Sequence, residues 1–179
     1  TPETIESLTE GRIDFGVVTT PFEAGKGIRQ IPVMPFRNVF IAGKRFEYLK
    51  GKELDYKVLS GLPCIFLERN TSTRTFMDRF LEEHSIRLTP EFELAISDMV
   101  VQFAKRNMGV GCVMEGFARE ALERGEVFEL KFRREMPLRQ ICVVTGDENL
   151  ISLAGRSLFQ MITGGEQRNY GNDTEENGK

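Results

Sequence analysis

Short apolar segments alternate with amphipathic segments along most of the chain, and this alternation is what most constrains its fold. The clearest example is the apolar run 63–67, whose length and continuity are typical of a strand buried on both faces of a parallel sheet. It stops at a polar turn, after which Phe76, Met77 and Phe80 fall on one helical face. Strands that alternate with amphipathic helices predict an α/β fold with largely parallel pairing.

The same patterns assign the other elements of the chain. Helices are expected from the first residue to Gly11 and over 97–107, 117–122 and 150–163, with Ser97 as an N-cap. Strands are expected over 13–18, 28–34, 38–42, 91–96, 111–114, 127–132 and 140–144. A short helix with a connector is expected over 47–59, and a flexible tail from Gly164 onward.

Composition excludes several classes of protein. At 179 residues, 40% apolar and 28% charged, the chain fits one ordinary globular domain or two small lobes. A net charge of −3 argues against a surface that binds nucleic acid, and no apolar run approaches the roughly 20 residues that span a bilayer. No signal peptide opens the chain. Its abrupt start, with Thr1 and Pro2 already forming a helix cap, leads us to expect a fragment of a longer protein.

The three cysteines indicate where the protein resides. Cys64, Cys112 and Cys142 are odd in number and lie far apart inside apolar runs. We expect them to be buried and reduced, which favours a cytoplasmic protein.

A polar turn follows the apolar run and contains Asn70, Thr71, Ser72, Thr73 and Arg74. Unpaired N–H groups and the helix dipole make a helix N-terminus favourable for an anion, and hydroxyl groups add donors. A cation such as Arg74 is unfavourable in the first turn unless an acceptor lies nearby. Alternatively, Asn70 or Thr71 is merely the N-cap and Arg74 points to solvent. Because a buried strand leads into this turn, we predict an anion site here.

A second polar segment follows the first expected strand. Thr19 and Thr20 precede Pro21, which is common turn chemistry. Across a cleft from the other turn, however, their hydroxyls would complete a polar cage.

No pattern in the sequence calls for catalysis, a cofactor or a metal. His84 is the only histidine, and its acidic neighbours near a helix end favour a surface role. Gly109 and Gly111 follow a helix and precede a strand, the reverse of the order in a dinucleotide site. One histidine and three core-like cysteines form no metal-ligand cluster, so we expect no enzyme, cofactor or metal.

The order of motifs resembles a known family. The segments concerned are LTEGRIDFGVV (8–18), LERNTSTR (67–74), ISD with VV (96–101), MGVGCVM (108–114), GEV (125–127) and the strand and helix over 141–162. In this order and spacing they resemble the effector-binding domain of LysR-type transcriptional regulators. Each motif alone is loose, but together they extend over nearly the whole chain.

The resemblance implies a fold like that of the type 2 periplasmic binding proteins, with two α/β lobes and an effector in the cleft between them. The sheets would be mixed, mostly parallel and flanked by helices. Lobe I would comprise 1–34 and 136–163, lobe II 35–135, and the tail 164–179. The family's cleft is lined by the matching turn and strand end, which implies contacts at Thr19, Thr20 and Asn70 to Arg74. Val110 and Met114 are the implied apolar walls.

The chain departs from the family pattern at its start. The family has a strand, a helix and another strand before the first element here, and a winged helix-turn-helix before those. Neither is present in the sequence. The pocket is therefore expected to be incomplete, and DNA contacts are expected only through the absent helix-turn-helix.

The sequence hypothesis is a non-enzymatic, cytoplasmic sensing domain of a transcription regulator. It would bind a small anionic metabolite and act as a homodimer or tetramer in the full-length protein, without contact to a membrane. The alternative is a solute-binding protein of a transporter, which shares the fold.

Overall fold

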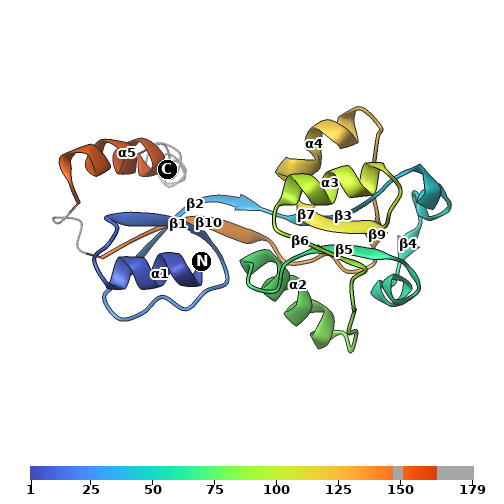
Figure 1. The fold of residues 1–179 in the computed structure, drawn as a ribbon, viewed down its shortest axis with the longest axis horizontal. Helices are drawn as coiled ribbons and strands as arrows, with labels where there is room; N and C mark the ends of the chain where they lie inside the picture. The colour runs from blue at the N-terminus through green and yellow to red at the C-terminus, as the bar shows by residue number, and fades with distance from the viewer. Residues whose placement is uncertain (147–150, 165–179) are drawn as a thin grey trace, which may run out of the picture. The chain divides into compact units, whose positions relative to one another are not determined.

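The computed structural model describes residues 1–146 and 151–164 and shows a mixed α/β protein (Figure 1). The chain divides into two compact units. Unit 1 contains Thr1–Pro35 and the described residues from Arg139 onward, and unit 2 contains Phe36–Leu138. The predicted tail beyond Gly164, and the predicted start of the last helix at Leu150, lie outside the described residues.

Unit 2 is built on a five-stranded mixed sheet. Its strands lie in the order β6 (Phe92–Leu94), β5 (Cys64–Leu67), β7 (Val110–Met114), β3 (Asn38–Ala42) and β8 (Phe128–Glu129). Strand β5 is parallel to β6 and β7, whereas β3 is antiparallel to β7 and β8. Helix α2 (Ser72–Glu83) covers one face, and helices α3 (Ser97–Lys105) and α4 (Glu115–Glu123) cover the other (Figure 1).

Both faces of this sheet are buried, because successive side chains of a strand point to opposite sides and both sides meet helices. Phe40 and Phe66 pack against α2 on one side, and Ile41 and Ile65 pack against α3 and α4 on the other. A Cβ at Gly111 would lie 2.6 Å from Val100 Cγ1, so glycine permits the close approach of α3 to β7.

A smaller layer extends the α2 side of unit 2. Two 3-10 helices (Lys44–Leu49 and Tyr56–Gly61) flank β4 (Glu53–Leu54), which pairs in parallel with β9 (Lys131–Phe132). The rings of Tyr56 and Phe132 stack with centroids 4.0 Å apart, and Phe40 meets Phe132 edge to face at 5.3 Å. Aromatic side chains therefore fill this layer.

Unit 1 is built on a three-stranded sheet in the order β1 (Phe15–Thr19), β10 (Arg139–Thr145) and β2 (Arg29–Phe36). Strand β1 is antiparallel to β10, with Phe15 opposite Thr145. Helix α1 (Pro2–Thr9) supplies Leu8 to the cluster on one face, and helix α5 (Leu153–Thr163) supplies Phe159 to the cluster on the other.

The α/β class predicted from the sequence is confirmed, but the pairing is more mixed than expected. Segment 127–132 is not one strand: β8 pairs with β3 and β9 pairs with β4, with Leu130 between them. Ser97 is not the N-cap, since Ile96 occupies that position and Ser97 begins the helix.

All three cysteines are buried and none forms a disulfide bond, as predicted. Burial, with a smaller contribution from Glu91, raises the pKa of the Cys64 thiol to about 12, so the thiol stays protonated at neutral pH. Among the described residues, no helix has the length and apolar character to cross a membrane.

Candidate functional site

The polar turn of unit 2 connects the buried strand β5 to helix α2, as predicted. Thr71 is its N-cap: the hydroxyl accepts a hydrogen bond from the Arg74 N–H at 3.3 Å and donates one to the Glu68 carbonyl at 2.8 Å. Of the two alternatives for the cap, the structure therefore selects Thr71, and its hydroxyl is committed to that task. Asn70 is exposed, while Ser72 and Thr73 are half-buried in the first turn of α2.

Arg74 does not point to solvent, so that alternative for its side chain is wrong. Its side chain is 1% exposed, and its Nε donates to the Asp78 carboxylate at 2.9 Å. Its Nη1 donates to the Leu67 carbonyl at 3.0 Å and lies 3.3 Å from Glu93. The guanidinium also lies over the Phe66 ring. Arg74 thus joins α2 to Leu67 at the end of β5 and to Glu93 of β6, and groups of this chain accept its hydrogen bonds.

Arg74 also borders a cavity of about 370 Å³ in unit 2. Arg69, Glu82 and Arg87 share this cavity with it, but Ser72 and Thr73 do not line it. Arg69 lies 3.7 Å from Glu93 and Arg87 lies 3.5 Å from Glu82, so carboxylates offset its cations. The cavity is therefore separate from the hydroxyls of the turn.

In unit 1, the two predicted threonines contact an arginine that the sequence analysis missed. Arg139 is 1% exposed; its Nη2 donates to the Thr19 hydroxyl at 2.9 Å and its Nε to the Thr20 carbonyl. The Thr20 hydroxyl accepts from the Gln140 N–H at 2.9 Å. The only sequence signal was the charge of Arg139 itself, directly before the predicted apolar strand 140–144.

The two predicted apolar residues lie at opposite ends of β7. Val110 is fully buried and pairs with Cys64, at the start of β5 and not at the end that leads into the turn. This burial argues against the wall predicted at Val110. Met114 lies at the carboxyl end of β7, half-buried, opposite Asn38. The predicted contacts therefore form two groups, one in each unit, with Met114 at the same edge of the sheet as the polar turn.

A charged cluster in unit 2 also escaped the sequence analysis. Arg37 donates from Nε and Nη2 to Glu115, at 3.0 and 2.9 Å, and from Nη1 and Nη2 to Glu129, at 2.6 and 3.0 Å. The hydrogen bonds with Glu115 and then Glu129 raise the pKa of the guanidinium, and the bond with Arg37 lowers the pKa of the Glu115 carboxyl. Glu115 and Glu129 lie 78 and 92 positions from Arg37 in the sequence, so no local pattern indicated this cluster.

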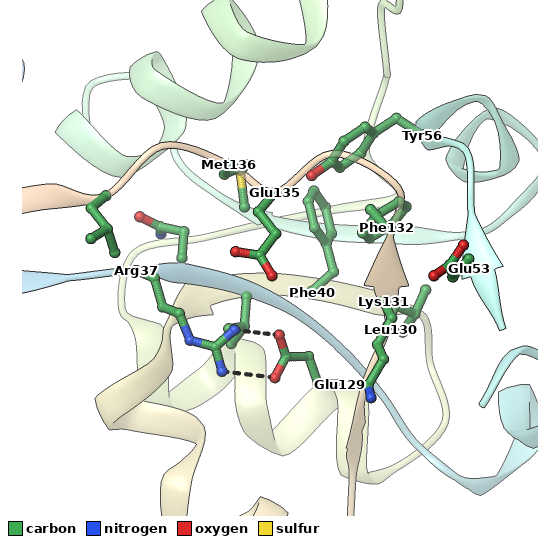
Figure 2. Close-up of a pocket in the computed structure, with 13 residues that line it drawn as sticks. Arg37, Phe40, Glu53, Tyr56, Glu129, Leu130, Lys131, Phe132, Glu135 and Met136 are labelled. Carbon is green, nitrogen blue, oxygen red and sulfur yellow. Dashed lines mark hydrogen bonds and ion pairs between the residues drawn. The ribbon is translucent and has the colours of Figure 1, made fainter. Parts of the chain in front are cut away.

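Beside this cluster, unit 2 has a cavity of about 400 Å³ that is open to solvent (Figure 2). Its lining combines charged and aromatic side chains: Arg37, Phe40, Glu53, Tyr56, Glu129, Lys131, Phe132 and Glu135. The Tyr56 hydroxyl donates to the Arg134 carbonyl at 2.8 Å. Burial, followed by the charges of Cys112 and Glu135, raises the pKa of this phenol, so it remains a donor at neutral pH.

Within residues 1–146 and 151–164, no group of three or more histidine, cysteine or acidic side chains could hold a metal ion. His84 packs against Phe80 and Tyr56, and its Nδ1 lies 2.8 Å from the Phe80 carbonyl. The His84 side chain therefore packs against aromatic rings of unit 2.

Comparison with known proteins identifies the family. Residues 1–166 match the family model for the LysR substrate binding domain. The chain belongs to this family. Members are effector-binding domains of LysR-type transcriptional regulators and not enzymes, so the family and the non-enzymatic role predicted from the motifs are confirmed. A comparison with curated proteins finds no match.

Solved LysR regulatory domains share the fold. The regulatory domain of CcmR from Synechocystis PCC6803, in complex with 2-PG, is 18% identical with a TM-score of 0.77, over 89% of this chain and 76% of that one. The effector-binding domain of QuiR in complex with shikimate is 15% identical with a TM-score of 0.78, over 94% and 79%. The apo regulatory domain of HypT from Salmonella typhimurium is 15% identical with a TM-score of 0.75, over 92% and 78%. The fold is thus that of LysR substrate-binding domains, which are periplasmic-binding-protein-like.

Proposed function

We propose that this chain senses a small anionic metabolite for a LysR-type regulator and thereby controls DNA binding by a helix-turn-helix domain of the full-length protein. The match of residues 1–166 to the LysR substrate-binding domain carries this proposal. The neighbours in complex with 2-PG and shikimate support a small molecule as the effector.

The polar turn of unit 2 supports an anion as the ligand. The first N–H groups of α2 are oriented toward its N-terminus, where the helix dipole favours negative charge. We assign the direct contacts to Ser72 and Thr73, with Asn70 at the rim. Arg74 donates a hydrogen bond to Asp78 and forms an ion pair with Glu93, and Thr71 caps the helix. Arg74 and Thr71 therefore position the start of α2.

We assign further contacts to Thr19 and Thr20 of unit 1 and to Met114 of unit 2. Buried Arg139 orients the Thr19 hydroxyl through a 2.9 Å hydrogen bond and adds positive charge beside it. Charge-assisted hydrogen bonds of this type are worth about 1.5–3 kcal/mol each when desolvated. Positive charge beside an oriented hydroxyl supports an anionic ligand.

The remaining parts of the proposal concern the full-length protein. We propose that the two units are the lobes expected over 1–34 with 136–163 and over 35–135. A ligand that prefers one arrangement of the lobes would shift the regulator, which we expect to be a cytoplasmic homodimer or tetramer. The buried, protonated thiol of Cys64 supports a reducing compartment.

Isothermal titration calorimetry of the 179-residue chain tests ligand binding. The panel comprises shikimate, other short carboxylates, sulfate and phosphate. We expect one class of anion to bind, and binding to weaken at least about tenfold in the Ser72→Ala, Thr19→Ala double variant. Ser60→Ala removes an exposed hydroxyl elsewhere in unit 2 and should leave the affinity unchanged.

Two results would contradict the proposal. If the double variant bound the identified anion as tightly as the unsubstituted chain, the contact residues would be wrong. If the full-length regulator bound its operator with the same affinity and footprint in the presence and absence of that anion, the sensing role would be wrong.

A further inference from the structure

We propose that unit 2 contains a second ligand site, in the cavity beside Arg37, which accepts a small organic cation: an ammonium group carried on a compact apolar body. None of the residues lining this cavity belongs to the polar turn or to the strand end of unit 1. The proposal thus goes beyond anion sensing and does not depend on it.

The cavity has the size and the apolar wall for such a body. Its volume of about 400 Å³ lies in the range of small-molecule sites. The half-buried ring of Phe132 stacks on Tyr56 and meets Phe40 edge to face, which fixes its orientation. Met136 and the 69% exposed Leu138 continue the apolar lining. Aromatic faces attract cations, so this wall favours a positive over a negative ligand.

The charge of the cavity points the same way. Three lining carboxylates, those of Glu53, Glu129 and Glu135, face two cations, Arg37 and Lys131. Four of the five N–H donors of Arg37 are already donated to Glu115 and Glu129, so Arg37 offers little to an anion. The local balance is therefore negative.

Glu135 is the group that would receive the ammonium. In Figure 2 its carboxylate extends into the space between Phe40 and the Arg37–Glu129 pair. Among the residues that the structure describes, no hydrogen bond or ion pair is formed by this side chain, although Arg37 lies in the same cavity. An ammonium at this position would pair with Glu135 while its apolar body packs against Phe132 and Met136.

The position of the cavity within unit 2 gives the site a consequence. Arg37 and Asn38 are among the first residues of the unit, and Met136 and Leu138 are among its last. A ligand in the cavity would contact both ends of the unit's chain and restrain the segments that lead into β2 and β10. Such a ligand could therefore modulate the response to the effector.

Three probes that differ in charge test the site. Phenethylammonium, 2-phenylethanol and 3-phenylpropionate carry the same ring on short chains and are titrated into the ¹⁵N-labelled 179-residue chain by NMR. We expect chemical-shift changes at residues 131–138, and a dissociation constant for the ammonium about tenfold below that of the alcohol. The carboxylate should bind most weakly.

Two charge-neutralising variants locate the effect. Glu135→Gln keeps the shape of the side chain and should abolish the preference for the ammonium over the alcohol. Glu123→Gln, an exposed glutamate on α4 away from the cavity, should retain that preference. The Ser72→Ala, Thr19→Ala double variant should also retain it, so this proposal and anion sensing can fail independently.

The proposal is overturned if the three probes bind equally, since the cavity would then be an unselective apolar depression. It is also overturned if no probe shifts the resonances of 131–138, or if Glu135→Gln retains the preference. Thermal unfolding of each variant verifies that the chain remains folded.

Discussion

The five-stranded sheet of unit 2 is covered by helices on both faces, whereas the three-stranded sheet of unit 1 leaves β2 largely exposed. Every residue of β3 is buried, while Phe36 is the only buried residue of β2. Unit 2 has two large apolar clusters, one on each side of its sheet, and the clusters of unit 1 are small. Because apolar burial dominates folding free energy, unit 2 should hold most of the stability of the chain.

The same contrast holds for the two buried arginines. Arg74 of unit 2 contacts Asp78 on its own helix and Glu93 on β6, and therefore consolidates a packed turn. Arg139 of unit 1 donates to oxygens of Thr19 and Thr20, residues that we assign to ligand contact. The well-packed unit thus uses its arginine for structure, while in the less-packed unit the arginine orients a proposed contact.

Phe40→Ala should have the largest effect on stability. The ring is 1% exposed and contacts Tyr56, Phe66 and Phe132, so truncation leaves a cavity and should cost about 3–5 kcal/mol in the free energy of unfolding. Phe159→Ala in unit 1 should cost less, because Phe159 is 8% exposed and belongs to a smaller cluster.

Urea unfolding followed by circular dichroism measures both losses. Met34→Ala, at an exposed position on β2, should change the free energy of unfolding by about 0.5 kcal/mol or less. Equal losses for Phe40→Ala and Phe159→Ala would break the contrast between the units.

Arg74→Met should have the next largest effect. The substitution deprives the Leu67 carbonyl of a donor, leaves Asp78 without its cation and leaves Glu93 with only the more distant Arg69. Both carboxylates are partly exposed and water can solvate them, so we expect a loss of about 1–3 kcal/mol. Arg79→Met, on the exposed side of the same helix, is the matched control. Similar midpoints for the two variants in urea would show that Arg74 is not a structural contact.

The sequence predicted the elements well because their signals are local. The apolar run 63–67, the polar turn and the helix after it were all visible in consecutive residues, and the structure has them at nearly the same bounds. The motifs likewise sufficed for the family, because their order survives where overall identity is low.

Contacts between distant residues could not be predicted from one sequence. Arg37 meets Glu115 and Glu129 only because β3 pairs with both β7 and β8, and that register depends on tertiary packing. Arg139 reaches Thr19, 120 positions away, for the same reason in β1 and β10. The partner Asp78 of Arg74 was visible at i, i+4 spacing, but Glu93 on β6 was not.

The two helix caps allow a direct comparison of the units with smaller effects. Thr71 caps α2 in unit 2; Ser152 caps α5 in unit 1 and also donates to the Asp14 carboxylate at 2.6 Å. Alanine at either position should cost about 1 kcal/mol. Thr71→Ser and Ser152→Thr keep the hydroxyl and should restore most of it.

Amide hydrogen exchange locates each loss. We expect Ser152→Ala to accelerate exchange in α5 alone, while Thr71→Ala affects α2, which is anchored by Arg74 and a large core. Faster exchange throughout unit 2 in Ser152→Ala would contradict the separation of the units.

The smallest expected effect is the pH dependence of the Arg37 cluster. The hydrogen bond from Arg37 lowers the pKa of Glu115 in the folded state below its unfolded value, near 4.3. The resulting stabilisation is complete above the unfolded pKa and is lost as the pH falls through the lowered folded pKa. The difference in stability between the unsubstituted chain and Arg37→Met should therefore shrink in acid. Because both partners are more than a third exposed, this difference should be about 1 kcal/mol or less at pH 7.

Urea midpoints between pH 7 and pH 3 measure the difference in stability. Arg12→Met is the control, because the pair of Arg12 with Glu10 in unit 1 is exposed at 58% and 52%. A difference that stayed constant with pH would mean that Arg37 acts through packing of its alkyl chain, and the charged cluster would then give unit 2 no electrostatic advantage over unit 1.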